Sequence, residues 1–402
     1  MWLRDLKLVL PDGVVARGAL EIVDDRIGSV VVGDPPPGVS ALHAQGLTAI
    51  PGLIDLHGDM LERDIEPRPN AFFPIDLALY ELDKRMASAG FTTAFAAVGF
   101  SWHKKDLRTQ EIATEIIETI GAHRHDLLVE FFVHARFEIN NPDTGSILEG
   151  LLARGLVQLV SLMDHTPGQG QYSDIGRYID FMEKWLGIPR ELLEGDAKTK
   201  MTARIEENFA APRDWESAEE VCRVARRYGI PIASHDDDTH AKIDRMGAMG
   251  VTISEFPVTR EAAEYARARG MSTIMGAPNA YRGSSNTGNL SARAAVEAGL
   301  VDVLATDYFT PAPLNAAYKL ANEGVLPLHR AIALVSANAA AAVGLTDRGR
   351  LESGLLADIA LIEEGTHPRV RAVLKRGTPI YWDSHMQRLS QLPVASLVEG
   401  DS

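Results

Sequence analysis

The chain has 402 residues, a formal net charge of −15 and a hydrophobic fraction of 46%. Its length fits one large α/β barrel with a smaller appended domain, and its apolar content excludes a disordered chain. The negative charge argues against a nucleic-acid or anionic-membrane partner. Because no apolar run approaches about 18 residues and the start lacks a signal-peptide layout, we expect a cytoplasmic protein with no membrane contact. Whether it forms a homo-oligomer stays open.

Both ends of the chain have the texture of short β-strands. Turn signals such as Pro11-Asp12-Gly13 separate apolar segments near the start, and similar segments return after residue 349. We predict a small β-sandwich domain built from both termini, with residues 1–48 as its N-terminal part and 346–384 as its C-terminal part. Residues 385–402 carry no clear pattern and are predicted to be a tail.

Between the two ends, residues 49–345 alternate strand and helix patterns. The helical patterns include residues 76–90, 111–123 and 215–229. The eight strand candidates are TAIPGLIDLH, TTAFAAVGF, LLVEFFVHARFE, VQLVSLMDH, IPIASHDD, VTISEFPV, MSTIMGAPN and VDVLATDY. This alternation predicts a (β/α)₈ TIM-like barrel, and an open doubly wound sheet is the weaker alternative. Residues 169–214 look helical and charged, which fits either a lid or inert packing.

The single cysteine, Cys222, excludes a disulfide within the chain. It lies in the helical segment AEEVCRVARRYG. We therefore predict a packed apolar thiol there and no nucleophile.

Polar residues stand where the barrel strands end. Since side chains at the carboxyl ends of barrel strands form the active site, these residues are its candidates. They are His57 and Asp59 on the first strand, His134, Arg136 and Glu138 on the third, Asp164 and His165 on the fourth, His235 and Asp236 on the fifth, and Asp307 on the eighth. Alternation along an extended strand places residues i and i+2 on one face, so His57 and Asp59 point the same way.

Histidines and carboxylates in this arrangement suit a divalent metal, with zinc first and manganese or iron as alternatives, and with one or two ions. The predicted ligands are His57, Asp59, Glu138, His165, His235 and Asp307. A metal lowers the pKa of bound water toward about 7, and Asp307 is predicted to be the catalytic residue that takes its proton. His134 and Asp164 are predicted to orient an imidazole. Asp237 and Asp238 are predicted to lie in a solvated loop.

Several motifs resemble one family. PGLIDLHGD after an N-terminal β segment, a late TDY and a closing GLLADIAL resemble the amidohydrolase superfamily. VSLMDHTPGQ, ASHDDDTH and MGAPNAYRGSSNTGN are similar to one branch of it, the α-D-ribose 1-methylphosphonate 5-triphosphate diphosphatases of the carbon–phosphorus lyase pathway. The resemblance runs from about residue 1 to 383 and implies hydrolysis of a triphosphate with release of pyrophosphate. The chain departs from that branch at Gly58, usually threonine, and at Asn286, usually histidine.

A polyphosphate substrate needs cationic and backbone donors, and arginine offers the bidentate geometry. Arg136 lies on the same face of its strand as Glu138. Arg282 opens a Gly/Ser/Asn loop whose amides are placed to cradle phosphate oxygens. The predicted substrate contacts are Arg136, Arg282, Asn279, Arg68 and Ser285.

Two other functions stay open. A C–N hydrolase such as a deacetylase or a cyclic amidase would use the same fold and metal with fewer cations. A catalytically inactive scaffold is the third possibility, against which the full set of candidate ligands argues. The absence of a Walker-type phosphate loop argues against kinase or ATPase chemistry.

Overall fold

The computed structural model describes residues 1–100, 107–165, 213–285 and 289–391, together with residues 170, 199 and 203. The contacts within the chain divide it into two compact units. One consists of residues 1–96, 122–131 and 303–402, and the other of residues 97–121 and 132–302.

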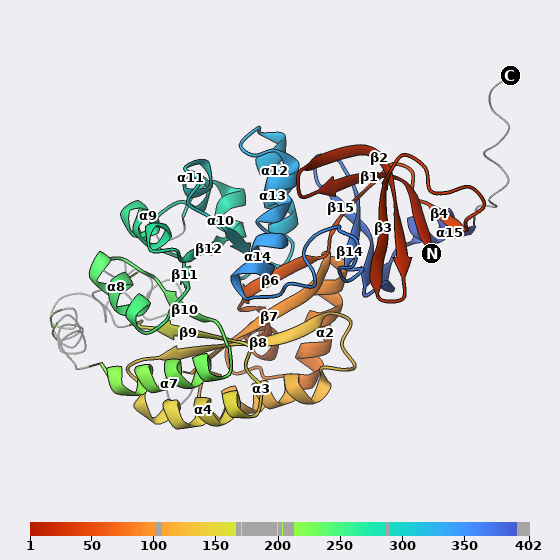
Figure 1. The fold of residues 1–402 in the computed structure, drawn as a ribbon. Helices are drawn as coiled ribbons and strands as arrows, with labels where there is room; N and C mark the ends of the chain where they lie inside the picture. Colours follow the sequence, from red (N-terminus) through yellow and green to blue (C-terminus); the bar gives the residue numbers. More distant parts are fainter. Residues whose placement is uncertain are drawn as a thin grey trace, which may run out of the picture. The chain divides into compact units, whose positions relative to one another are not determined.

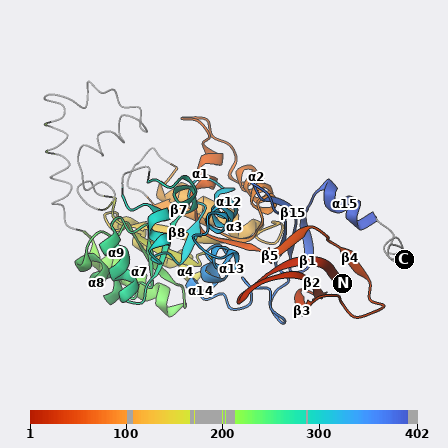
Figure 2. The same cartoon turned by 90° about the horizontal axis from the view of Figure 1, so that it is seen from above.

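Both ends of the chain contribute to one mixed β-sheet in the first unit, with the strand order β16-β15-β14-β5-β1-β2-β3 and β4 paired with β1. Figures 1 and 2 show N-terminal and C-terminal strands side by side in this sheet. The strands are β1 (Trp2–Leu10), β2 (Gly13–Val23), β3 (Arg26–Val32), β4 (Ala41–His43), β5 (Leu47–Pro51), β14 (Ile359–Glu363), β15 (Arg369–Lys375) and β16 (Thr378–Trp382). Strand β5 joins the two ends because it pairs parallel with β1 and antiparallel with β14.

This terminal sheet has its own hydrophobic core. Leu6, Leu20, Ile359 and Leu374 are fully buried in one cluster that draws side chains from strands far apart in the sequence. Burial of this much leucine and isoleucine surface stabilises the domain by about 1.5–3 kcal/mol for each large side chain. The prediction that the two termini build one small β domain is therefore supported by a shared core.

The second sheet is parallel and runs in chain order from β6 to β13. Its strands are β6 (Leu53–Gly58), β7 (Phe91–Phe100), β8 (Glu130–Glu138), β9 (Leu159–Met163), β10 (Ile232–His235), β11 (Ile253–Glu255), β12 (Ser272–Gly276) and β13 (Val303–Ala305). A parallel bridge between Gly58 and Asp307 links the end of β6 with the residues after β13. The sheet is thus a nearly closed eight-stranded barrel, which confirms the predicted (β/α)₈ class and excludes the open sheet.

Helices separate the parallel strands, as right-handed βαβ connections require. The described helices between these strands are α1 (Met60–Ile65), α2 (Ile75–Ser88), α3 (Gln110–His123), η1 (Pro142–Thr144), α4 (Gly145–Ala153), α7 (Trp215–Arg227), α8 (His240–Ala248), α9 (Arg260–Ala268), α10 (Ala277–Arg282) and α11 (Ala292–Glu297). The last parallel strand is followed by α12 (Ala312–Asn322), α13 (Leu328–Ala333) and α14 (Ala337–Ala342), and β16 is followed by α15 (Ser384–Gln391). Local signals set several boundaries. Asp214, Thr239 and Thr259 cap α7, α8 and α9 through side-chain oxygens that accept a backbone N–H three residues on.

Two segments differ from the sequence predictions. The apolar run 48–57, predicted as one barrel strand, divides at Gly52 into β5 of the terminal sheet and β6 of the barrel. A Cβ at Gly52 would lie 2.4 Å from the Thr92 side chain, so this junction needs glycine. Residues 385–391, predicted to begin the tail, belong to α15 (Ser384–Gln391), and Met386 is fully buried in the core of the terminal sheet. The tail from residue 392 and most of 169–214 lie outside the described residues.

Within the described part of the chain, every helix is too short or too polar to cross a membrane.

Cys222 is buried on α7, as its helical pattern predicts. Burial raises the pKa of the thiol to about 12. Since the thiolate is the reactive form, we expect the folded protein at pH 8 to react with a thiol reagent at least about a hundredfold more slowly than the urea-unfolded chain. Absorbance after addition of an aromatic disulfide measures both rates. Rapid stoichiometric labelling of the folded protein would contradict this assignment.

Candidate metal centre

Three of the predicted ligands meet where β6 ends. Nε2 of His57 lies 3.6 Å from Oδ1 of Asp59. The backbone N–H of Asp307 donates to the carbonyl of His57 at 2.9 Å, and the N–H of Asp59 donates to the carbonyl of Asp307 at 2.8 Å. His57 is buried, whereas Asp59 and Asp307 are half-buried. The last barrel strand therefore presents Asp307 beside the first-strand pair.

Three further predicted ligands gather at the ends of β8, β9 and β10. The Glu138 carboxylate binds Nδ1 of His165 and accepts the backbone N–H of that residue at 3.3 Å. The rings of His165 and His235 lie edge to face with centroids 5.6 Å apart. His165, His235 and Asp236 each offer a ligand atom, and these atoms lie within 4.8 Å of one another.

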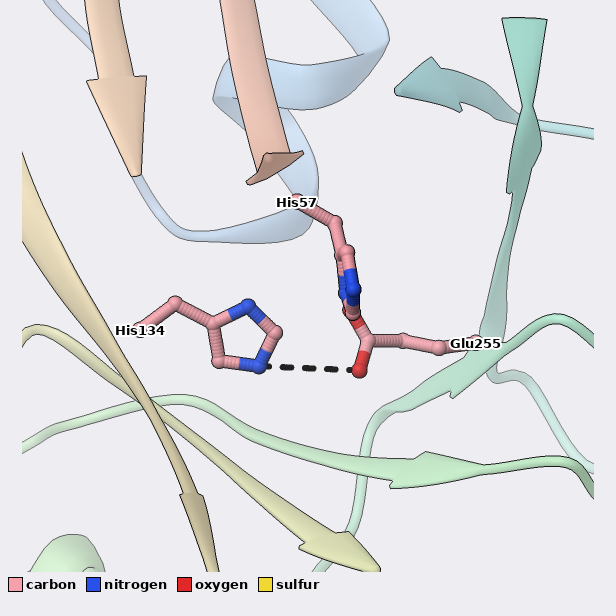
Figure 3. Close-up of side chains that lie close together, drawn as sticks. All are labelled: His57, His134 and Glu255. Carbon is pink, nitrogen blue, oxygen red and sulfur yellow. Dashed lines mark ion pairs between the residues drawn. The ribbon is translucent and has the colours of Figure 1, made fainter. Parts of the chain in front are cut away.

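A second group contains a residue that the sequence interpretation missed. Figure 3 shows His57, His134 and Glu255 pointing toward one another from β6, β8 and β11, and their ligand atoms also lie within 4.8 Å of one another. His134 and Glu255 are fully buried, with Nε2 of His134 3.6 Å from Oε2 of Glu255. The hydroxyl of Ser161 donates to Glu255 at 2.7 Å and orients this carboxylate.

Three residues that follow the ends of barrel strands have a strained backbone. Asp236, Phe256 and Asp307 have φ values of 54°, 51° and 56°, in the left-handed region that favours glycine. Strain of about 1–3 kcal/mol for each residue persists only where the surrounding structure imposes it, and such residues cluster at functional sites. Asp236 and Phe256 directly follow His235 and Glu255, and Asp307 is itself a predicted ligand, so these turns set where the side chains of the site point.

Charges within the group shift its protonation. Burial raises the pKa of the Glu138 carboxyl, but His165 and Arg136 outweigh burial and bring it below its ordinary value. Burial lowers the pKa of His235. Asp236 is likewise buried, yet its pKa is lowered by His235 and His165. An ionised carboxylate and a neutral His235 imidazole are the protonation states that metal ligation needs.

The donor set fits a divalent metal. Buried imidazole nitrogens and carboxylate oxygens are the ligands of Zn²⁺, Mn²⁺ and Fe²⁺, and burying this many charges without a cation is unfavourable. The cluster of His57, His134 and Glu255 is therefore consistent with a divalent metal site.

The predicted substrate contacts are distributed differently. Arg136 is buried on β8, two residues before Glu138. The others follow β6 or β12. Arg68 and Arg282 are exposed, and Asn279 and Ser285 are half-buried. The Asn279 side chain accepts the N–H of Ala292 at 3.3 Å, which ties α10 to the start of α11. Asn286, at which the chain departs from the diphosphatase motif, lies outside the described residues.

Asp237 and Asp164 are both held by polar side chains. Asp237, predicted to lie in a solvated loop, is fully buried, and that prediction is wrong. Its carboxylate accepts the hydroxyls of Ser234 at 2.6 Å and Ser254 at 2.5 Å, so it joins the ends of β10 and β11. Asp164, predicted to orient an imidazole, accepts hydrogen bonds from Arg213 at 3.0 Å and Asn140 at 3.2 Å.

The position of Glu255 could have been predicted from the sequence. It is the last residue of β11, so the strand-end rule that selected His57 and His235 applies to it as well. Asp55 had no such signal, because its partner is Thr306, 251 residues further along the chain.

A nearly closed parallel barrel with histidines and carboxylates at the carboxyl ends of its strands defines the class of metal-dependent barrel hydrolases. Residues 190–381 match the model of the Amidohydrolase family. This match, together with 32% identity to an Escherichia coli diphosphatase, shows that the chain belongs to the amidohydrolase family, as its motifs predict.

Over 392 residues the chain is 32% identical to the alpha-D-ribose 1-methylphosphonate 5-triphosphate diphosphatase of Escherichia coli strain K12, covering 95% of this chain and 100% of that protein. Solved structures agree on the fold. The β-aspartyl dipeptidase of Fervidobacterium islandicum has a TM-score of 0.64 at 16% identity, covering 95% of this chain and 96% of that one. The dihydropyrimidinase of Brevibacillus agri has a TM-score of 0.56 at 12% identity, covering 95% of each chain.

Proposed function

We propose that this protein hydrolyses α-D-ribose 1-methylphosphonate 5-triphosphate, releasing pyrophosphate and leaving the 5-phosphate, in phosphonate catabolism. The observation that carries the proposal is the similarity to the E. coli diphosphatase over the full length of both chains. The cluster of buried imidazoles and carboxylates supplies the matching chemistry.

The proposed ligands of the metal are His57, Asp59, Glu138, His165, His235 and Asp307. His134 and Glu255 stand next to His57 and are further candidates. The number of histidines and carboxylates suits one or two ions, with zinc first and manganese or iron as alternatives. When bound, such an ion makes a water acidic near neutral pH and neutralises charge that develops on phosphoryl oxygens.

Asp307 is the proposed proton acceptor for the attacking water. Its carboxylate is half-buried, and its backbone is fixed on both sides by hydrogen bonds to His57 and Asp59. Fixing the backbone leaves the side chain few orientations, and a positioned base contributes about 10²–10⁴-fold to a rate.

The proposed grip on the triphosphate comes from arginines and from the amides of the loop after α10. Arg136 places a buried cation next to Glu138, where its positive charge also lowers the pKa of that carboxyl. Arg282 ends α10 and is exposed, and Gly283 takes φ of 79° as the helix turns into the loop. A chain with a net charge of −15 needs local cations to hold a polyanion.

Arg282→Met tests this grip. A charge-assisted contact contributes about 1.5–3 kcal/mol, so kcat/KM for the triphosphate should fall roughly ten- to hundredfold, with little change for any neutral ester or amide that the enzyme accepts. The matched control is Arg227→Met, an exposed arginine in the last turn of α7, because α7 leads into the opposite, amino end of β10. Equal losses on charged and neutral substrates would mean that Arg282 is structural.

Substrate profiling separates the proposal from a C–N hydrolase. Steady-state kcat/KM is measured for the ribosyl triphosphate, a dipeptide and a cyclic amide with the same metal-loaded protein. We expect the triphosphate to exceed both amides by at least about a thousandfold, the scale on which a charged site rejects a neutral substrate. A preference for either amide would overturn the proposal.

A further inference from the structure

The end of β6 is joined to the residue before Asp307 by a buried carboxylate. Asp55 is 1% exposed. Its Oδ1 accepts the backbone N–H of Thr306 at 2.8 Å, and its Oδ2 accepts the Thr306 hydroxyl at 2.5 Å. The same hydroxyl lies 3.2 Å from the carbonyl of His57. We call this arrangement of Asp55 and Thr306 the clasp.

The clasp leaves no room for a side chain at Gly58. A Cβ there would lie 2.8 Å from Oδ2 of Asp55 and 2.9 Å from the Thr306 hydroxyl, closer than real Cβ atoms approach any neighbour. The sulfur of Met60 lies 3.4 Å from that hydroxyl and its methyl 2.7 Å from the same Cβ. Gly58 is therefore matched to the clasp.

Asp307 follows the clasp directly and has φ of 56°, which is unfavourable for a residue with a side chain. Its backbone N–H donates to the carbonyl of His57, and its carbonyl accepts the N–H of Asp59. Thr306 is fully buried and has both its N–H and its hydroxyl bound to one carboxylate. The residue before the strained position is thus held at two points.

From these contacts we propose that Asp55 and Thr306 are positioning residues, which hold the backbone of Asp307 in its left-handed conformation opposite His57. The inference rests on the proposed role of Asp307 as proton acceptor. Loss of the clasp leaves the other proposed ligands and the substrate contacts in place but lets the Asp307 side chain adopt other orientations, so kcat should fall more than KM rises.

Thr306→Val removes the hydroxyl at nearly unchanged volume, and Thr306→Ser restores it. We expect Thr306→Val to lower kcat by about tenfold or more with KM changed less than about threefold, and Thr306→Ser to recover most of kcat. Metal content should equal that of the unmodified protein in both variants. If Thr306→Val turns over at the native rate, or if Thr306→Ser does not recover kcat, the clasp has no positioning role.

The chain offers a matched control at the other end of the barrel. Thr273 near the start of β12 is fully buried, and its N–H donates to Asp302 at 2.9 Å. Its hydroxyl donates to the carbonyl of Leu300 at 2.5 Å and lies 3.2 Å from the same Asp302 carboxylate. Thr273→Val removes the same kind of bond, so it should lower the melting temperature comparably while leaving kcat unchanged. A matching loss of kcat in Thr273→Val would show that Thr306 acts only through stability.

Hydrogen exchange separates failure of the clasp from failure of the proposed function. The Asp307 amide is bonded to His57, so the peptide covering residues 303–310 should exchange faster in Thr306→Val than in the native protein, and no faster in Thr273→Val. If the native protein releases no pyrophosphate, the proposed function fails, yet faster exchange would still establish the clasp. Unchanged exchange would overturn the clasp whatever the activity.

Discussion

His57→Ala is expected to lose its metal and at least about a thousandfold in kcat while the barrel stays folded. His57 lies next to the last residue of β6. Its ligand atom is within 4.8 Å of those of His134 and Glu255, and its Nε2 is 3.6 Å from Oδ1 of Asp59. The substitution removes the imidazole that neighbours Asp59 as well as His134 and Glu255. Loss of the bound ion would remove several kcal/mol of transition-state stabilisation. Elemental analysis after gel filtration, together with circular dichroism, measures metal content and fold on the same sample.

His123→Ala is the matched control for this variant. His123 ends α3, is half-buried and bonds the hydroxyl of Tyr80 at 2.9 Å, so its loss removes an imidazole contact away from the strand ends that carry the cluster. It should retain full metal and activity. A His57→Ala protein that still carries the native amount of metal would remove His57 from the ligand set.

Asp307→Asn should lower kcat by about a hundredfold or more and change KM little. The amide has nearly the shape of the carboxylate but cannot accept a proton from water at neutral pH. Asparagine tolerates the left-handed backbone almost as well as aspartate, so the φ of 56° imposes no new strain. Steady-state kinetics with the triphosphate measures the change.

Asp24→Asn controls for the backbone. Asp24 lies in the turn between β2 and β3, is exposed and has φ of 52°, so the substitution is the same in the same conformation. Its activity and melting temperature should match those of the native protein. Near-native turnover by Asp307→Asn would exclude Asp307 as the base and would point to another carboxylate of the cluster.

Local patterns were sufficient to predict the barrel. Each of the eight strand candidates covers a strand of the parallel sheet to within one residue, because each is an apolar run bounded by turn residues and followed by a helical pattern. The division between β5 and β6 at Gly52 was not predicted, because nothing in the mostly apolar run of ten residues indicates that its two halves belong to different sheets. His57 and His235 were predicted as site residues because functional side chains of such barrels lie at the carboxyl ends of the strands.

Long-range pairing could not be predicted from the sequence. Asp55 looks like a core aspartate inside a strand until Thr306 is placed beside it, and the two are 251 residues apart. Asp237 looks like one charge in an acidic run, yet Ser234 and Ser254 enclose it. In both cases a buried carboxylate accepts a hydroxyl from another part of the barrel, Thr306 for Asp55 and Ser254 for Asp237, and periodicity does not encode such a contact.

The most direct test of a metal-dependent diphosphatase follows both products by phosphorus NMR. The protein is stripped with a chelator, divided, and incubated with α-D-ribose 1-methylphosphonate 5-triphosphate with and without one added divalent metal. We predict that only the metal-restored sample releases pyrophosphate and the 5-phosphate in equal amounts, and that Asp307→Asn with full metal releases neither at an appreciable rate. Equal turnover without metal, or release of orthophosphate in place of pyrophosphate, would contradict the account.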